Sequence, residues 1–154
     1  MEYLITKWLH VLSSTILFGT GIGSAYYMLF TSLTRDARAT AVVVRHVVIA
    51  DWVFTTPTII LQPLTGFYLI HLAGYPLSLP WISWSIALYL FAGACWLPVV
   101  WMQIRMCALA ATAARDGVDL PLPYWRYLRW WVALGVGAFV ALLVVFYLMV
   151  AKPA

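Results

Sequence analysis

Only one side chain that titrates near neutral pH interrupts the first long apolar stretch of the chain, and it is His10. Residues 9–33 contain no Asp, Glu, Lys or Arg. A run of this length can cross a bilayer, which takes about 20 apolar residues. An imidazole in hydrocarbon is costly unless it finds a partner, so its presence indicates a functional site. Because a histidine inside a small helical membrane protein commonly serves as an axial ligand of haem iron, we expect His10 to bind haem.

A second haem ligand is harder to choose from the sequence. His46 and His71 are separated by 25 residues, or about 37 Å along a helix, so they cannot share a metal. His71 is closer in depth to His10 and is the expected second ligand. On the face below His10, Ser14 and Gly21 leave room for a flat macrocycle, although small residues equally permit a close helix contact.

The second apolar stretch carries a polar stripe. Residues on one helical face at 100° per residue are Asp51, Thr55, Thr58, Gln62 and Thr65. Lipid cannot satisfy these groups, so the stripe must point into a helix bundle. It is either a structural polar seam or a path for a ligand or for protons.

Asp51 needs a partner if it lies within the membrane. Arg105 is the expected counter-ion, with Arg45 as the alternative. Asp51 is then either half of a structural ion pair, a proton relay or an anchor for a polar ligand. The same two arginines would suit the propionates of haem or of a porphyrin, because guanidinium binds carboxylate in a bidentate manner.

Sulfur side chains suggest a weaker alternative. Cys95, Met102 and Met106 share a face of the third apolar stretch, and soft sulfur ligands suit Cu(I). Methionine is also a routine packing residue in apolar helices. Cys95 and Cys107 are the only cysteines and predict no disulfide framework.

The composition is that of a membrane protein. The 154 residues are 65% hydrophobic and 9% charged, whereas soluble domains are about half apolar and a quarter charged. We expect one all-α domain over residues 1–154. The net charge of +4 does not indicate nucleic-acid binding, because the basic residues lie in short loops between apolar segments.

Four transmembrane helices are expected, at residues 3–30, 46–70, 81–106 and 130–150. All seven arginines flank the first and third connections, whereas Lys7 and Lys152 lie at the opposite ends of the spans. The positive-inside rule then places both termini outside, as in a multi-pass protein of the bacterial inner membrane. The tryptophans expected to form an aromatic belt at the span ends are Trp81, Trp84, Trp125, Trp130 and Trp131.

Small-residue repeats predict where the helices approach one another closely. Gly19 with Gly23 forms one such repeat, and Ala133, Gly137 and Ala141 form another. Kinks are expected at the prolines inside the spans, which are Pro57, Pro63 and Pro98.

Three sequence blocks resemble a known family. The runs KWLHVLSSTILFGTGIGSAYYM, ADWVFTTPTIILQPLTGFYL and LYLFAGACWLPVVWMQIRM are similar to those of the bacterial membrane proteins grouped as domain of unknown function 2269. The layout more distantly resembles the four-helix protoporphyrinogen oxidases of the HemJ family. The shared residues are Lys7 and His10, then Pro63, Thr65 and Gly66, then Trp81. CopD-type copper proteins have a loosely similar first helix.

The HemJ resemblance implies haem b inside the bundle and electron transfer to a membrane acceptor. It assigns the ligand role to His10. The third span departs from the HemJ pattern, because Gln103 and Arg105 stand where a lysine and a following histidine are expected. The porphyrinogen-oxidising reaction is therefore not implied.

Together these patterns lead to three hypotheses. The first is a haem b-binding redox protein, either an oxidoreductase or an electron-transfer protein, with a porphyrin or a quinone as its partner. The second is a cofactor-free accessory or assembly subunit, held in a homo-oligomer or a larger membrane complex by helix contacts. The third is copper or proton transport along the Asp51 stripe.

Overall fold

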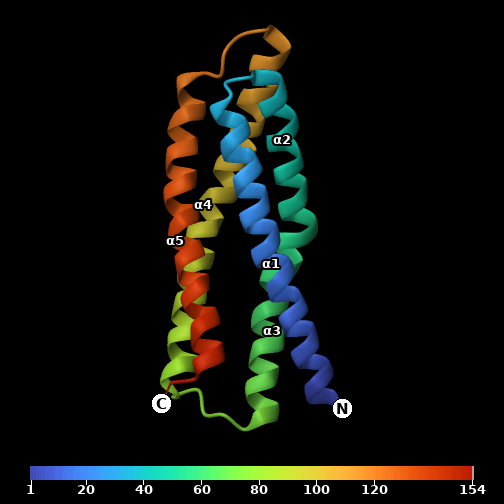
Figure 1. The fold of residues 1–154 in the computed structure, drawn as a ribbon, viewed down its shortest axis with the longest axis vertical. Coiled ribbons are helices and arrows are strands. Elements are labelled where there is room, and N and C mark those ends of the chain that lie inside the picture. Colours follow the sequence, from blue (N-terminus) through green and yellow to red (C-terminus); the bar gives the residue numbers. More distant parts are fainter. Residues whose placement is uncertain (154) are drawn as a thin grey trace.

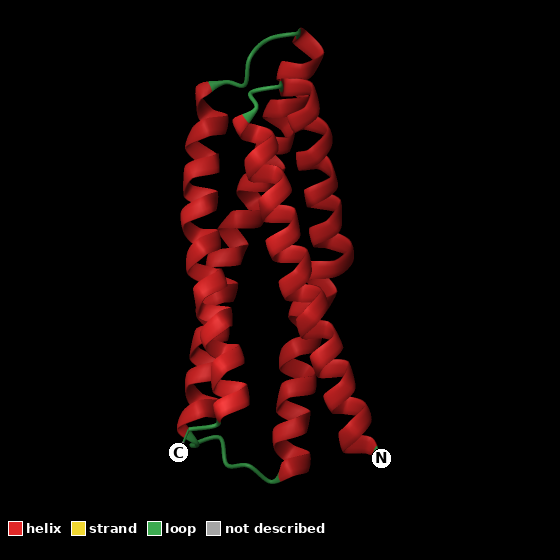
Figure 2. Ribbon diagram, viewed as in Figure 1, coloured by secondary structure: helices red, strands yellow, loops and turns green. Residues whose placement is uncertain are grey.

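The computed structural model describes residues 1–153, and these are helical apart from short loops (Figures 1 and 2). The elements are α1 (Glu2–Leu33), α2 (Ala37–Ala50), the π-helical segment η1 (Asp51–Thr55), α3 (Thr56–Ala73), α4 (Pro80–Asp116) and α5 (Leu122–Ala151). Because α2, η1 and α3 form one continuous segment, the described residues contain four helices long and apolar enough to cross a membrane. The all-α fold with four spans is confirmed.

The helices extend beyond the spans that the sequence predicted. The second helical segment begins at Ala37 rather than at residue 46, and α5 begins at Leu122 rather than at residue 130. Asp36 explains the first difference, because its carboxylate accepts hydrogen bonds from the amides of Arg38 (2.8 Å) and Ala39 (3.1 Å). This cap starts a helix in polar sequence, where hydropathy gives no signal.

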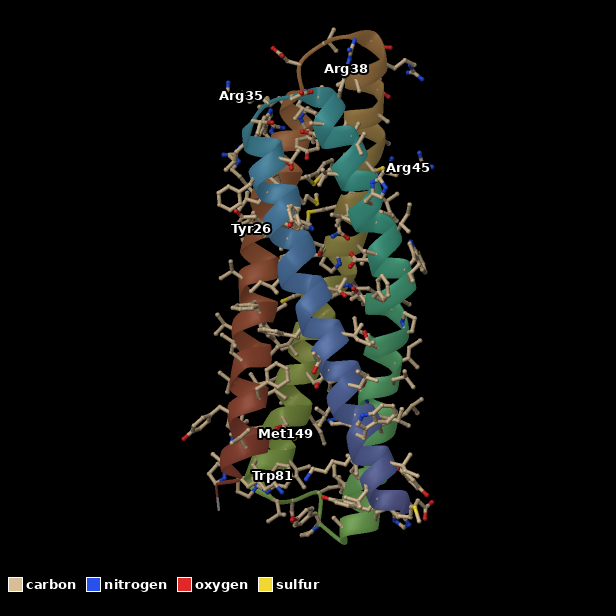
Figure 3. The ribbon with its side chains drawn as sticks, turned by 45° about the vertical axis from the view of Figure 1, so that its right-hand side comes forward. Tyr26, Arg35, Arg38, Arg45, Trp81 and Met149 are labelled. Carbon is tan, nitrogen blue, oxygen red and sulfur yellow. The ribbon has the colours of Figure 1, made fainter. Side chains whose placement is uncertain are left out.

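The two ends of the bundle differ in charge. Figure 1 places the loops after α1 and α4 at one end, and both termini with the α3–α4 loop at the other. We call the first the arginine end, because it carries Arg35 and Arg38, and the second the termini end. Figure 3 shows both arginines, together with Arg45, near the upper end and outside the bundle.

Close packing is concentrated in the arginine half. A buried cluster joins α1, α2, α4 and α5 there, and it includes Met28, Val44, Met106 and Tyr124. The Tyr124 hydroxyl lies 2.6 Å from the hydroxyl of Ser32 and links α5 to α1. Towards the termini end, the ribbons separate into an α1–α3 pair and an α4–α5 pair (Figure 1).

The glycine repeats do not bring the helices of this chain together. A Cβ atom added at Gly19, Gly21 or Gly23 would meet nothing within 4 Å. Gly137 has only the ring of Phe91 nearby, at 3.9 Å. The expected close contact at Gly19 and Gly23 is therefore wrong within the chain, because both glycines border open space rather than a neighbouring helix.

The second segment is irregular one turn before the expected kink at Pro57. In η1, the amide of Thr56 bonds to the carbonyl of Asp51, which is five residues earlier. The Thr56 hydroxyl donates to the same carbonyl at 2.9 Å. Such π-helical turns are often found at functional sites.

Candidate functional site

The polar stripe points into the bundle, as the sequence predicted. Asp51, Thr55, Thr58 and Gln62 are all buried, and Thr65 is half-buried. The stripe serves two separate places, however. Its Gln62–Thr65 part contacts α1, whereas its Asp51–Thr55 part lines a cavity with residues of α1, α4 and α5.

The first place is a group of hydrogen-bonded residues around His10. The Nδ1 atom of His10 lies 2.8 Å from the hydroxyl oxygen of Thr65. That hydroxyl also lies 2.6 Å from the carbonyl of Leu61. When it donates there, its oxygen accepts from the imidazole, which then carries its proton on Nδ1 and leaves the Nε2 lone pair free. No hydrogen bond of Nε2 is found within residues 1–153.

Gln62 holds the backbone beneath this imidazole. Its amide nitrogen donates to the carbonyl of His10 (2.8 Å) and to the hydroxyl of Ser13 (2.5 Å). Ser13 in turn donates to the His10 carbonyl at 3.1 Å. We refer to His10, Ser13, Gln62 and Thr65 as the histidine hub, and it connects α1 to α3.

Gly66 gives the imidazole its space. A Cβ atom at this position would stand 3.3 Å from Cε1 of His10. Of the chain's glycines, this is the one at which an added Cβ meets another residue most closely. A side chain here would push the ring, so Gly66 and Thr65 together fix its position.

The histidine hub has the form of a single metal ligand with its support. Metal-bound histidines usually donate their second ring N–H to an oxygen, which orients the ring and leaves the other nitrogen for the metal. His10 meets this description through Thr65. In the described residues no three His, Cys, Asp or Glu side chains gather as a protein-only metal site.

The other residues predicted for this site form no hydrogen bond with His10 in the described chain. His71 is exposed on α3, and no hydrogen bond joins it to His10 in the described chain. The Nδ1 atom of His46 pairs with the carbonyl of Val42, at 2.8 Å on its own helix. Ser14 donates to the carbonyl of Val11, whereas Gly21 lines the cavity described next.

The second place is the surroundings of Asp51. This carboxylate is 6% exposed and accepts a 2.8 Å hydrogen bond from Thr55. Gln103 of α4 lies beside it and is 3% exposed. Asp51 and Gln103 therefore form a buried polar pair between η1 and α4.

The ion pair expected for Asp51 is absent from the described residues. The salt bridge found there joins Arg115 to Asp116 on the surface. Arg105 instead stacks over the ring of Trp101, 5.5 Å from its centroid, and Arg45 points outward (Figure 3). No ion pair forms because both arginines lie on exposed helix faces, whereas Asp51 faces inward.

A cavity of about 430 Å³ adjoins Asp51 and Gln103, between α1 and α5. We call it the α1–α5 cavity. Three buried polar atoms of its lining have no hydrogen-bond partner in the described chain: the indole nitrogens of Trp96 and Trp131 and the amide oxygen of Gln103.

Sequence reasoning missed this group. Trp96 and Gln103 are seven residues apart, which is two helical turns and therefore one face of α4. That spacing was a usable signal. Trp131 was assigned to the aromatic belt but is 6% exposed, and Trp81 is also buried. The assignment of Trp131 was wrong because α5 begins at Leu122, eight residues before the expected span, so Trp131 lies inside the helix and is buried. Trp81 does lie at the start of α4, but its ring is buried against Tyr75, with the two centroids 5.6 Å apart.

The methionines of the suggested copper face belong to the packed core. Met102 and Met106 lie in the buried cluster of the arginine half. Cys95 is buried and forms no disulfide. Packing therefore accounts for the two methionines.

The chain belongs to the family of predicted integral membrane proteins described as DUF2269, whose model matches residues 4–153. No curated protein and no solved structure matches the chain. The family assignment confirms the first resemblance and agrees with four membrane-spanning helices.

Proposed function

We propose that this member of the DUF2269 family binds haem b through His10 and takes part in electron transfer in the bacterial inner membrane. The observation that carries the proposal is the state of the imidazole. Its Nδ1–H is held by Thr65, and its Nε2 lone pair has no partner within residues 1–153. We place the arginine end in the cytoplasm and both termini outside.

The chemistry of the donor set fits haem better than a bare metal ion. A porphyrin supplies four nitrogen ligands, so the protein needs to provide only one or two. A lone, well-oriented histidine satisfies that need, whereas a bare zinc or copper ion requires several protein ligands. His71 would be the second axial ligand; otherwise the sixth position stays open.

The propionates need a cation at the depth of His10. His10 lies eight residues from the start of α1, about 12 Å, whereas Arg105 lies 25 residues from the start of α4, about 37 Å. Arg45 is also in the arginine half. We therefore assign the propionates to Lys7, one turn from His10 towards the termini end.

When bound, the haem would supply a one-electron carrier. The residues of this chain would act on it through the ligand. Thr65 holds the His10 proton on Nδ1, and Gln62 fixes the backbone that carries the ring. A quinone or a porphyrin would be the partner that exchanges electrons with it.

The absorption spectrum of the purified full-length protein tests this proposal. Produced in haem-replete cells, it should show a Soret band and reduced-minus-oxidised α and β bands, with about one haem b per chain by pyridine haemochrome. His10→Ala should lose the haem, and the matched control His46→Ala should retain it. A wild-type protein without Soret absorption, or an unchanged haem content in His10→Ala, would refute the assignment.

A second candidate is a cofactor-free subunit of a homo-oligomer or a larger membrane complex. The observation that favours it is the open space at Gly19 and Gly23, since a small-residue repeat unused within the chain can receive a helix from outside. A stoichiometric partner that co-purifies with a colourless protein would favour this candidate. Gly19→Leu should then release the partner, whereas Ala94→Leu, which adds a leucine on an exposed face of α4, should not.

Transport along the stripe is the remaining candidate, with protons or copper as the cargo. Its support is the burial of Asp51, Thr55 and Thr58 on one helix. In liposomes, Asp51→Asn should abolish a proton or copper flux that depends on the protein. Equal flux for wild type and Asp51→Asn would exclude this candidate.

A further inference from the structure

The α1–α5 cavity has features of a ligand site that are independent of His10. It is bounded by α1 and α5, which make few contacts with each other, and its inner wall comes from α4 and η1. His10 is not part of its lining. Its lining includes Asp51, Trp96, Gln103, Trp131 and Ala138.

The unpaired polar atoms define what a ligand must offer. The indole N–H groups of Trp96 and Trp131 are donors and need acceptors. The amide oxygen of Gln103 is an acceptor and needs a donor. Buried polar groups without partners are rare in folded proteins, so a ligand with carbonyl or hydroxyl groups would complete this set.

The lack of a cation in the lining disfavours an acidic head group. Asp51 is buried in the wall, and no Lys, Arg or His side chain lines the cavity in the described chain. A phosphate or carboxylate would therefore meet a carboxylate without a compensating cation. Phospholipids, fatty acids and haem propionates are disfavoured, and a neutral head group is favoured.

The shape and the aromatic lining suit a planar ring with an apolar tail. Phe18 and Phe139 stack across α1 and α5, with their centroids 5.0 Å apart, and both line the cavity. Gly21 and Gly135 widen the space between the same helices, since an added Cβ would meet nothing within 4 Å. Tyr26 lies on the outer side of α1 in Figure 3, so this cavity has an edge towards the lipid.

We propose that the α1–α5 cavity binds a neutral membrane lipophile of the quinone or quinol class, with its ring oxygens at Trp96, Gln103 and Trp131. The molecule enters from the bilayer between α1 and α5. The indole nitrogens have almost no accessible surface in the empty cavity, so the Trp96 and Trp131 rings must turn slightly on binding. The ligand's carbonyl or hydroxyl oxygens then accept from the two indoles. In the quinol form, a hydroxyl donates to the Gln103 oxygen. The site stands whether or not His10 holds haem.

Quenching of tryptophan fluorescence tests this site in the full-length protein in nanodiscs, titrated with decylubiquinone and with its reduced quinol. The midpoint of the titration, not its amplitude, is the readout, since the chain has nine tryptophans. We expect saturable binding that is unchanged in His10→Ala. Trp131→Phe should weaken it about five- to tenfold through the loss of one hydrogen bond.

Two matched controls separate the cavity from its surroundings. Ala138→Leu fills the cavity and should abolish saturable binding, whereas Ala133→Leu makes the same change on an exposed face of α5 and should not. Trp130→Phe, beside Trp131 but 67% exposed, should also leave the midpoint unchanged.

Several results would contradict a quinone site in the α1–α5 cavity. Non-saturable quenching, or equal midpoints for Ala138→Leu and Ala133→Leu, would show partition into lipid rather than binding. Displacement of decylubiquinone by palmitate or phosphatidylglycerol at equal concentration would show a site for acidic lipids instead. Loss of binding in His10→Ala alone would move the quinone to the histidine hub.

Discussion

The histidine hub and the α1–α5 cavity draw on the same polar stripe but differ in how completely they are bonded. In the hub, Gln62, Ser13 and Thr65 all find partners, and the Nε2 atom of His10 is left over. In the cavity, three buried polar atoms lack partners within residues 1–153.

This difference separates two kinds of binding site. A ring held on one nitrogen and confined by Gly66 is preorganised to offer one lone pair in one direction. The cavity instead has three unpartnered polar atoms in the residues that line it, and the proposed ligand would complete their hydrogen bonding. The histidine hub is suited to coordinate a metal, and the α1–α5 cavity is suited to enclose a ligand.

The largest expected effect concerns the preorganisation of the hub. Thr65→Val keeps the shape of the side chain but removes the oxygen that accepts from His10. We expect haem affinity to fall about 10- to 100-fold, as is usual when the support of a metal-bound histidine is lost. Haem titration of the protein produced without haem measures the change.

Gly66→Ala tests the same preorganisation sterically. It should lower haem affinity as well, since the added Cβ would lie 3.3 Å from the ring. Gly93→Ala is the matched control, because the same methyl group meets open space there. Equal affinities for Gly66→Ala and Gly93→Ala would show that the ring is not held in place, and the contrast between the two sites would weaken.

The next effect is on stability. Gln62→Leu removes two hydrogen bonds between α3 and α1, and it should lower the free energy of unfolding by about 1–2 kcal/mol. Thr58→Val is the control on the same stripe. The Thr58 hydroxyl bonds only to carbonyls of its own helical segment, so its loss should cost less than about 0.5 kcal/mol. Unfolding in SDS measures both.

A reversed order would change the interpretation of the stripe. If Thr58→Val lowered the free energy of unfolding more than Gln62→Leu did, the hydrogen bonds within the segment would contribute more to stability than the two hydrogen bonds to α1. The histidine hub would then be a local feature of α3 rather than a link between two helices.

The sequence predicts the direction of the stripe but not its partners. Lipid cannot hydrogen-bond Asp51 or Gln62, so both must face inward whatever the packing. Which helix each one meets depends on how the helices cross, and no pattern within one segment encodes that. Gln62 therefore meets α1 and Asp51 meets α4, although periodicity treats them alike.

The roles of the glycines and tryptophans could not be predicted from the sequence for the same reason. Gly19 and Gly23 form a recognised packing repeat but contact nothing, whereas Gly66, in no such repeat, lies against His10. Trp130 and Trp131 are neighbours in the sequence, yet one is exposed and the other buried. Composition and spacing place such residues in a helix, but only the neighbouring helix decides their role.

The last expected effect concerns Asp51, and its sign distinguishes an unpaired carboxylate from an ion-paired one. Asp51 has no cation partner in the described chain, so Asp51→Asn should raise the free energy of unfolding by about 0.5–1 kcal/mol by removing a buried carboxylate. The amide oxygen can still accept from Thr55. Unfolding in SDS at pH 7, with no ligand added, measures the change, and Asp119→Asn in the α4–α5 loop is the control.

A decrease of about 3–5 kcal/mol in the free energy of unfolding would mean that Asp51 is ion-paired after all, since breaking a buried pair costs that much. The polar groups around Asp51 would then be paired, as Gln62, Ser13 and Thr65 are in the histidine hub, and no ligand would be needed to pair them.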